Sequence, residues 1–156
     1  MGETHKIVLT RVEPRHTAVV RERVTPARLA QFVPAACGEV WAYIRQAGSP
    51  NPGRNMALYR ADGSVECGVE VSAPFPGDGR VVCSQTPAGL VATAAHWGPY
   101  GLLGDTHLAI RQWCTEHGHQ VNGVSWELYG HWLPDWNADP SKIRTDVCYT
   151  VIEEPR

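Results

Sequence analysis

The sequence predicts an α+β fold made of two similar halves, each with the element order β-β-α-β-β. Three observations support this fold class: several short strand-like runs, two longer segments with helical spacing of apolar residues, and landmarks that recur after about 70 residues. The recurring landmarks are Pro14 with Pro87, Pro26 with Pro99, Gly48 with Gly118, and Leu58-Tyr59 with Leu128-Tyr129. We therefore expect one domain, residues 1–156, built from repeat one at about residues 5–74 and repeat two at about residues 79–153.

The first repeat is predicted to contain four antiparallel strands and one helix. Its strands are residues 6–10, 17–23, 55–60 and 64–73, with a turn at 12–15 joining the first two. The helix begins at Thr25-Pro26, because Thr is a favourable N-cap and Pro suits the first helical position. Pro34 is expected to kink or split this helix, and Gly48 to end it. Asp62-Gly63 is a typical hairpin turn between the last two strands.

The second repeat follows the same order. Its strands are residues 79–85, 89–97, 124–132 and 144–153, with a loop at 133–142 before the last one. Gly98-Pro99 opens the helix and Gly118 ends it. One helical face carries Leu103, His107, Ile110, Trp113/Cys114 and His117. Two such halves are expected to leave a central ligand cleft between them, since ligands favour such junctions.

The strand that contains Glu127 is the most informative segment. Alternation along a strand places Ser125, Glu127, Tyr129 and His131 on one face, and Trp126, Leu128 and Trp132 on the other. Burying a carboxylate without partners is costly. If this face lines a pocket instead, Glu127 would bind a cation or act as an acid–base group. The alternative is structural, with Glu127 paired to an arginine in the sheet. Glu66 and Glu70 alternate on an earlier strand and are expected to form a solvated face.

Composition excludes several classes of protein. A 43% apolar and 19% charged content is typical of an ordinary globular domain, and the net charge of −2 gives no footprint for nucleic acid or anionic membranes. No apolar run approaches the roughly 20 residues of a membrane helix, and the first six residues lack a signal-peptide pattern. The first strand begins within the first ten residues, so no helix-turn-helix is expected before it. We expect a cytoplasmic protein without direct DNA or membrane binding.

No metal or cofactor is expected from the sequence. The five cysteines are odd in number, widely spread and without a C-x-x-C pair, which argues against disulfides and a thiolate zinc site. The seven histidines form no H-E-x-x-H motif. The six tryptophans are more suggestive, because they suit either core packing or an aromatic-lined pocket. The Trp-rich segment 132–136 can equally be packed over the sheet or act as a lid.

The order and spacing of several short motifs resemble the GyrI-like small-molecule-binding domain over essentially the whole chain. The motifs are residues 39–44 before Gly48, His96-Trp-Gly-Pro-Tyr100, Gly118, Trp126-Glu127-Leu-Tyr129, and Arg144-Thr-Asp146. The resemblance implies two α+β repeats around a cleft in which Glu127 meets cationic, lipophilic ligands. Aromatic residues are expected around Glu127: Tyr129, Trp97, Tyr100, Tyr59, Trp41, Trp132 and Trp136.

The family leaves three functions open for this chain. The first is a stand-alone binding protein for lipophilic, cationic aromatic compounds. The second is a hydrolase of electrophilic cyclopropane-type DNA-alkylating compounds, in which Glu127 and Tyr129 would be catalytic and Tyr100 an alternative proton donor. The third, a protein partner role such as protection of DNA gyrase, is the least favoured, because the net charge is near zero and the tryptophans are assigned to a cleft.

Overall fold

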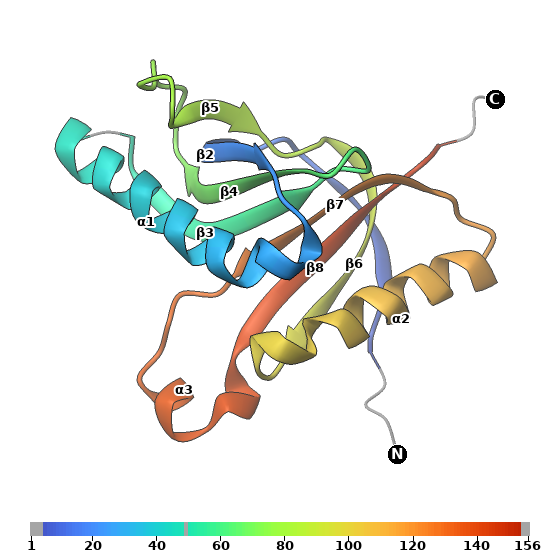
Figure 1. Ribbon diagram of the computed structural model, residues 1–156. Coiled ribbons are helices and arrows are strands. Elements are labelled where there is room, and N and C mark those ends of the chain that lie inside the picture. The colour runs from blue at the N-terminus through green and yellow to red at the C-terminus, as the bar shows by residue number, and fades with distance from the viewer. Residues whose placement is uncertain (1–4, 49, 154–156) are drawn as a thin grey trace. The chain divides into compact units, whose positions relative to one another are not determined.

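The computed structural model describes residues 5–48 and 50–153 (Figure 1). The start of the chain, which lacks a signal-peptide pattern, falls partly on residues 1–4, and these lie outside the described residues. The chain forms two compact units. Unit 1 runs up to Val12 and resumes at Gly89, and unit 2 comprises Glu13–Ala88.

Unit 2 is an antiparallel sheet with one long helix. Its elements are β2 (His16–Arg23), α1 (Leu29–Ala47), β3 (Pro52–Tyr59), β4 (Ser64–Val71) and β5 (Val82–Gln85), with a 3₁₀ turn at Pro26–Arg28 before α1. The strands are ordered β3-β4-β2-β5. Helix α1 packs on β2, β3 and β4 (Figure 1). Val20, Val40 and Cys67 are fully buried, so the apolar stripe of α1 and the sheet form the core of this unit.

Unit 1 repeats this plan. Its elements are β1 (Val8–Val12), β6 (Gly89–Trp97), α2 (Leu103–Glu116), β7 (Val121–Tyr129), α3 (Asp135–Ala138) and β8 (Arg144–Val151), with 3₁₀ turns at Tyr100–Leu102 and Pro140–Lys142. The strands are ordered β1-β6-β8-β7 and are antiparallel. Ile110 of α2 packs on Ala92 and Val147 in the core of this unit. The predicted α+β class with antiparallel sheets and two main helices is confirmed; the ligand cleft stays a prediction.

The two units differ from the two sequence repeats in one respect. The first strand of each repeat belongs to the unit that contains the rest of the other repeat. β1 pairs with β6, and β5 pairs with β2, so the expected pairing of the first two strands across a turn at 12–15 was wrong. Each exchanged strand leads into the next through three residues with a central proline, Pro14 or Pro87. Proline fixes φ and favours an extended residue before it, which suits a link better than a tight hairpin. Two hydrogen bonds of 2.9 Å join these links. The Arg15 N–H donates to the Thr86 hydroxyl, and the Thr86 N–H donates to the Arg15 carbonyl.

Several local expectations are corrected by the structure. Pro34 lies inside α1, which continues through it as one helix from Leu29 to Ala47. Gly48 ends α1 as expected, in the left-handed region at φ 71° with its N–H on the Ile44 carbonyl. β7 ends at Tyr129, so His131 and Trp132 follow the strand, and the loop after them contains α3. Pro34 is the sixth residue of α1, so its missing N–H removes one hydrogen bond to the carbonyl four residues before it, and the helix continues with its other hydrogen bonds.

Glu66 and Glu70 do not form a solvated face. Glu66 is 1% exposed and accepts hydrogen bonds from Arg60 at 2.9 Å, Arg21 at 3.1 Å and Ser84 at 2.7 Å. Glu70 is 7% exposed and lies 3.1 Å from Arg54. Arginines from neighbouring strands therefore cover these carboxylates and compensate their burial. Among the described residues, no helix is both long and apolar enough to cross a membrane.

Candidate ligand-binding site

A bulge interrupts β7 before Glu127. The register between β7 and β8 shifts between Val121 and Ser125, where Gly123 adopts φ 91° and the Asn122 side chain accepts the Val124 N–H at 3.0 Å. Four residues of β7, from Val121 to Ser125, run along two residues of β8, from Val151 to Tyr149, so the bulge holds two extra residues. Because two residues are added, Glu127 stays on the same face of the sheet as Val121, the face toward α2.

The predicted alternation along β7 is confirmed as far as the strand extends. Glu127 lies opposite Val147, a core residue beneath α2, so both side chains are on the helix-facing side of the sheet. Trp126 and Leu128 point the other way and are buried as well, at 3% and 8% exposed. Glu127 is 5% exposed, and so its carboxylate lies in the interior of the protein rather than on a solvated face.

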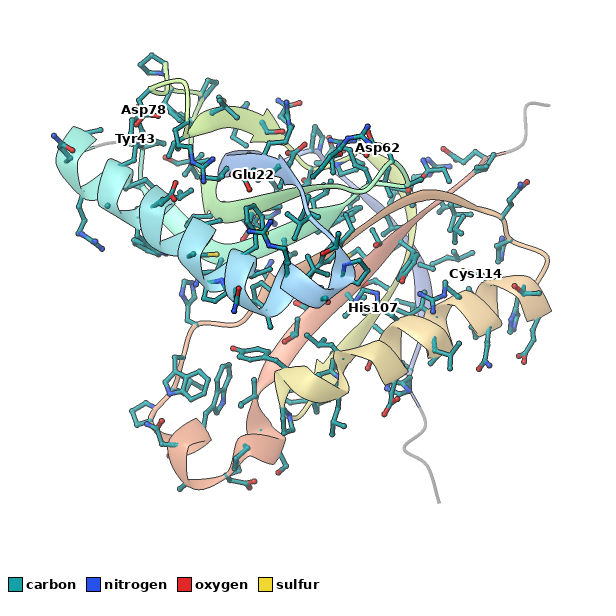
Figure 2. The ribbon with its side chains drawn as sticks, viewed as in Figure 1. Glu22, Tyr43, Asp62, Asp78, His107 and Cys114 are labelled. Carbon is teal, nitrogen blue, oxygen red and sulfur yellow. The ribbon has the colours of Figure 1, made fainter. Side chains whose placement is uncertain are left out.

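Both carboxylate oxygens of Glu127 are engaged by neighbouring side chains of unit 1. The Tyr129 hydroxyl donates to Oε1 at 2.5 Å, and His107 Nε2 lies 2.6 Å from Oε2. His107 Nδ1 lies 2.6 Å from the Tyr149 hydroxyl, which also accepts from Arg111 Nη1 at 2.9 Å. Figure 2 shows His107 on α2, the helix that carries Arg111. The site is thus a hydrogen-bonded chain from Arg111 to Glu127.

The hydrogen-bonding pattern of this chain fits a neutral His107 that donates to Glu127. Arg111 can only donate, so the Tyr149 oxygen accepts from it, and the phenol proton can be donated to His107 Nδ1. A neutral imidazole that accepts at Nδ1 carries its proton on Nε2, which then donates to Glu127. Burial raises the pKa of Tyr149, with Arg111 opposing this, so the phenol keeps its proton at neutral pH. The pattern holds the Glu127 carboxylate in one orientation.

The predicted aromatic residues fall into three groups. Tyr129 contacts Glu127 directly, and the Tyr100 ring meets the Tyr129 ring edge-on at 5.7 Å. Tyr100 is 44% exposed, and partial burial raises its pKa. Trp97 lies beside His96 in β6 and therefore faces the other side of the sheet, where its ring is 5.4 Å from the Arg144 guanidinium. Only Tyr129 and Tyr100 are therefore brought together with Glu127 by the contacts described in unit 1.

The remaining aromatic residues have local partners. Trp136 is 6% exposed and packs edge-on against Trp132 at 5.3 Å, next to Gly130 at the end of β7. Trp132 is 51% exposed. In unit 2, the Trp41 indole donates to Asn55 at 2.6 Å, and Tyr59 ends β3 in a half-buried position. Their part in ligand binding stays a prediction.

Sequence reasoning missed three residues of the site: His107, Arg111 and Tyr149. His107 was assigned to the apolar face of its helix and treated as one of several scattered histidines. Two signals could have singled it out: it is a polar residue within an apolar stripe, and it lies four residues before Arg111 on the same face. In the part of the chain that the structure describes, no group of three His, Cys, Asp or Glu residues could hold a metal ion.

Comparisons with known proteins identify the family of this chain and agree with its fold. The family model for the GyrI-like small molecule binding domain matches residues 5–151. The EcmrR C-terminal domain is similar over 97% of this chain and 100% of its own, with 18% identity and a TM-score of 0.76. A hydrolase from Listeria innocua is similar over 94% and 92%, with 14% identity and a TM-score of 0.61. SAV2435 bound to tetraphenylphosphonium is similar over 94% of each chain, with 14% identity and a TM-score of 0.62. No curated protein sequence matches this one.

Proposed function

Since the chain belongs to the GyrI-like small-molecule-binding domain family, we propose that it binds lipophilic aromatic cations with Glu127 as the acidic anchor. The observation that carries the proposal is the buried carboxylate of Glu127, 5% exposed and held in one orientation by Tyr129 and His107. SAV2435, a protein of similar fold, is described with tetraphenylphosphonium, which is a lipophilic cation. This likeness supports the same chemical class of ligand here.

The physical basis is charge attraction combined with aromatic contact. Opposite unit charges about 4 Å apart attract by about 4 kcal/mol at an effective dielectric constant of about 20, before desolvation is subtracted. A cation on an aromatic face adds about 1–2 kcal/mol. Tyr129 and the half-exposed Tyr100 supply rings next to the carboxylate. Flat rings accept ligands of many shapes, so we expect broad specificity within this class.

The test is binding of a cationic dye, rhodamine 6G, followed by fluorescence anisotropy and by competition with tetraphenylphosphonium. Glu127→Gln keeps the shape of the side chain and removes its charge, so it should weaken binding by about 1–3 kcal/mol. Glu116→Gln is the matched control, because it makes the same charge change at an exposed position of α2. Equal affinities of wild type and Glu127→Gln would remove Glu127 from the binding function.

A second candidate function is hydrolysis of electrophilic compounds such as strained cyclopropanes. The observation that favours it is the Tyr149–His107–Glu127 chain, in which an imidazole and a phenol orient a carboxylate. Glu127 would take a proton from water as the water oxygen bonds to a ring carbon. The ring C–C bond would break, and its electron pair would be protonated by Tyr129 or Tyr100.

The two candidate functions separate in the Glu127→Gln variant. A hydrolase would lose turnover of a cyclopropane-bearing alkylator while the variant still bound it, and product formation would be followed by chromatography and mass spectrometry. A binding protein would leave the compound intact in both forms. Failure of wild type to convert a panel of such compounds would contradict the hydrolase function.

A further inference from the structure

His107 can neutralise Glu127 from inside the protein. The two side chains are 2.6 Å apart and only 15% and 6% exposed. The chain of hydrogen bonds described above fits the neutral imidazole. It also fits the imidazolium, because the Tyr149 hydroxyl oxygen can accept from Nδ1–H as well as from Arg111. Both charge states of His107 are therefore compatible with the same side-chain positions.

We propose that His107 sets the charge of the ligand site, so that an organic cation and a proton on His107 compete for the Glu127 carboxylate. This inference rests on the proposed function. With a neutral imidazole the His107–Glu127 pair carries one negative charge and attracts a cation. With an imidazolium the pair has no net charge, and the attraction is largely lost. His107 is thus a positioning and specificity-determining residue that favours cations only when it is neutral.

The other charged and titratable groups around His107 do not account for this effect. Arg111 stays protonated, and Tyr149 stays neutral because burial raises its pKa. His96 of β6 and His5 before β1 bond to Thr106, the residue before His107, and not to Glu127. Among the contacts described within unit 1, the groups at His107 or its turn of helix are Glu127, Tyr129, Tyr149, Arg111, His96 and His5.

The sign of the pH dependence follows from this competition. Imidazole is the side chain that changes charge in the neutral range. Because imidazoles lose a proton as the pH rises through the neutral range, the competition predicts that the affinity for a cation increases about tenfold between about pH 5.5 and about pH 8, which is a coupling of about 1.4 kcal/mol. At the acid end, cation binding should release a proton. At the alkaline end it should release none.

Isothermal titration calorimetry of the whole chain with tetraphenylphosphonium tests this inference. Titrations in two buffers of different ionisation enthalpy report the protons released at each pH. Triphenylphosphine oxide, a neutral aromatic compound, serves as the uncharged comparison and should bind without this pH dependence. Proton release on tetraphenylphosphonium binding at the acid end supports the proposal. Tetraphenylphosphonium binding of constant affinity and no proton release at any pH overturns it.

His107→Gln is the informative variant, because the amide can keep both hydrogen bonds but cannot take up a proton. Its affinity should not change with pH, whatever its absolute value, whereas the control His5→Gln should keep the wild-type pH profile. A full pH dependence in His107→Gln would overturn the proposal and assign the titration to Glu127. If His107→Gln does not fold, the proton release of wild type decides alone. Absence of tetraphenylphosphonium binding at every pH would overturn the proposed function together with this inference.

Discussion

The two units place different chemistry on equivalent positions of the same plan. Counting back about 70 residues from the acidic site of unit 1 gives its counterparts in unit 2. Glu127 corresponds to Ala57, His107 to Cys37, Arg111 to Trp41, Ser125 to Asn55 and Tyr129 to Tyr59. The strand registers agree, since Glu127 lies opposite Val147 of β8 and Ala57 lies opposite Cys67 of β4. The duplication has therefore kept the scaffold and changed the side chains.

The counterpart site in unit 2 is uncharged. Ala57 is fully buried, and the Cys37 thiol donates to the Gly68 carbonyl at 3.5 Å. Burial raises the pKa of Cys37 to about 11, so the thiol stays neutral. Of the two equivalent positions 127 and 57, the one with a carboxylate is the one that His107 and Tyr129 contact. The comparison indicates that this position of the fold tolerates a buried carboxylate when hydrogen-bond partners for it are present as well.

The strongest test of this comparison is Ala57→Glu, which copies the charge without the imidazole that bonds to it in unit 1. Ala57 is fully buried, and its helix neighbour is a thiol rather than an imidazole. The variant should lose more than about 3 kcal/mol of unfolding free energy, because it buries a carboxylate beside a group that cannot compensate it. Urea unfolding followed by circular dichroism measures this loss.

The double variant Ala57→Glu, Cys37→His supplies the missing imidazole and is the matched control. It should regain a measurable part of the stability that the single variant loses, because the new pair can form the bond seen between Glu127 and His107. Equal stabilities of the single and double variants would contradict the equivalence of the two sites.

Both units have a packed apolar core, whereas the acidic site occurs at only one of the two equivalent positions. Removing a core side chain should therefore lower the unfolding free energy in either unit. Ile110 of α2 and Val40 of α1 are equivalent by the same offset, and both are fully buried. Ile110→Ala should cost about 3–4 kcal/mol and Val40→Ala about 2–3 kcal/mol, because isoleucine has one more methylene group to lose. Urea midpoints measure both effects. A cost below about 1 kcal/mol in either variant would show that this helix does not hold its unit together.

The sequence predicted the elements well because they depend on local periodicity. Strand pairing was less accessible, since nothing local indicates that β1 pairs with β6 rather than with β2. Glu127 and Tyr129 could be placed on one face because they are two residues apart in one strand. Their partner His107 comes from a helix and its support, Tyr149, from another strand, so this chain requires the tertiary register. The sequence pattern gives the face on which a residue lies but not what covers it.

Glu66 is another residue whose side-chain partners depend on the tertiary structure and could not be predicted from its own strand. Burial raises the pKa of Glu66, but hydrogen bonds from Ser84 and Arg60 and the charges of Arg21 and Arg60 outweigh it, so the pKa lies below its ordinary value. A carboxyl group with a lowered folded-state pKa stabilises the protein above its unfolded-state pKa, and this contribution is lost as the pH falls through the folded-state value. The loss should begin below about pH 4.5, the range in which an unfolded glutamate titrates.

Removing the Glu66 carboxylate should lower the unfolding free energy by less than adding one at Ala57 does, because the arginines around Glu66 can be solvated by water instead. Glu66→Ala should lower the unfolding free energy by about 2–3 kcal/mol at neutral pH, with a smaller difference from wild type in acid. Glu39→Ala is the control, since its ion pair with Arg80 is exposed and screened by water and should contribute little to stability. A constant difference between Glu66→Ala and wild type from neutral to acid pH would contradict the lowered pKa.

The smallest expected effect concerns the residue that follows each site tyrosine. Unit 2 has Arg60 there, which reaches Glu66, whereas unit 1 has Gly130. A Cβ at Gly130 would lie 2.9 Å from the Trp136 ring and 3.0 Å from the Arg144 carbonyl, so this glycine makes room for the segment that contains α3. Gly130→Ala should therefore cost about 1–2 kcal/mol, measured by urea unfolding through tryptophan fluorescence.

The same substitution elsewhere in unit 1 should act in the opposite direction. Gly104 lies in α2 with nothing within 4 Å of an added Cβ, and Gly104→Ala should stabilise the protein by about 0.5–1 kcal/mol because alanine is the better helix former. Opposite signs for the two variants would locate the cost at the Trp136 contact rather than in the change of residue type. Equal stabilisation by both would show that Trp136 does not rest on the end of β7, and the difference from unit 2 at this position would then need no packing explanation.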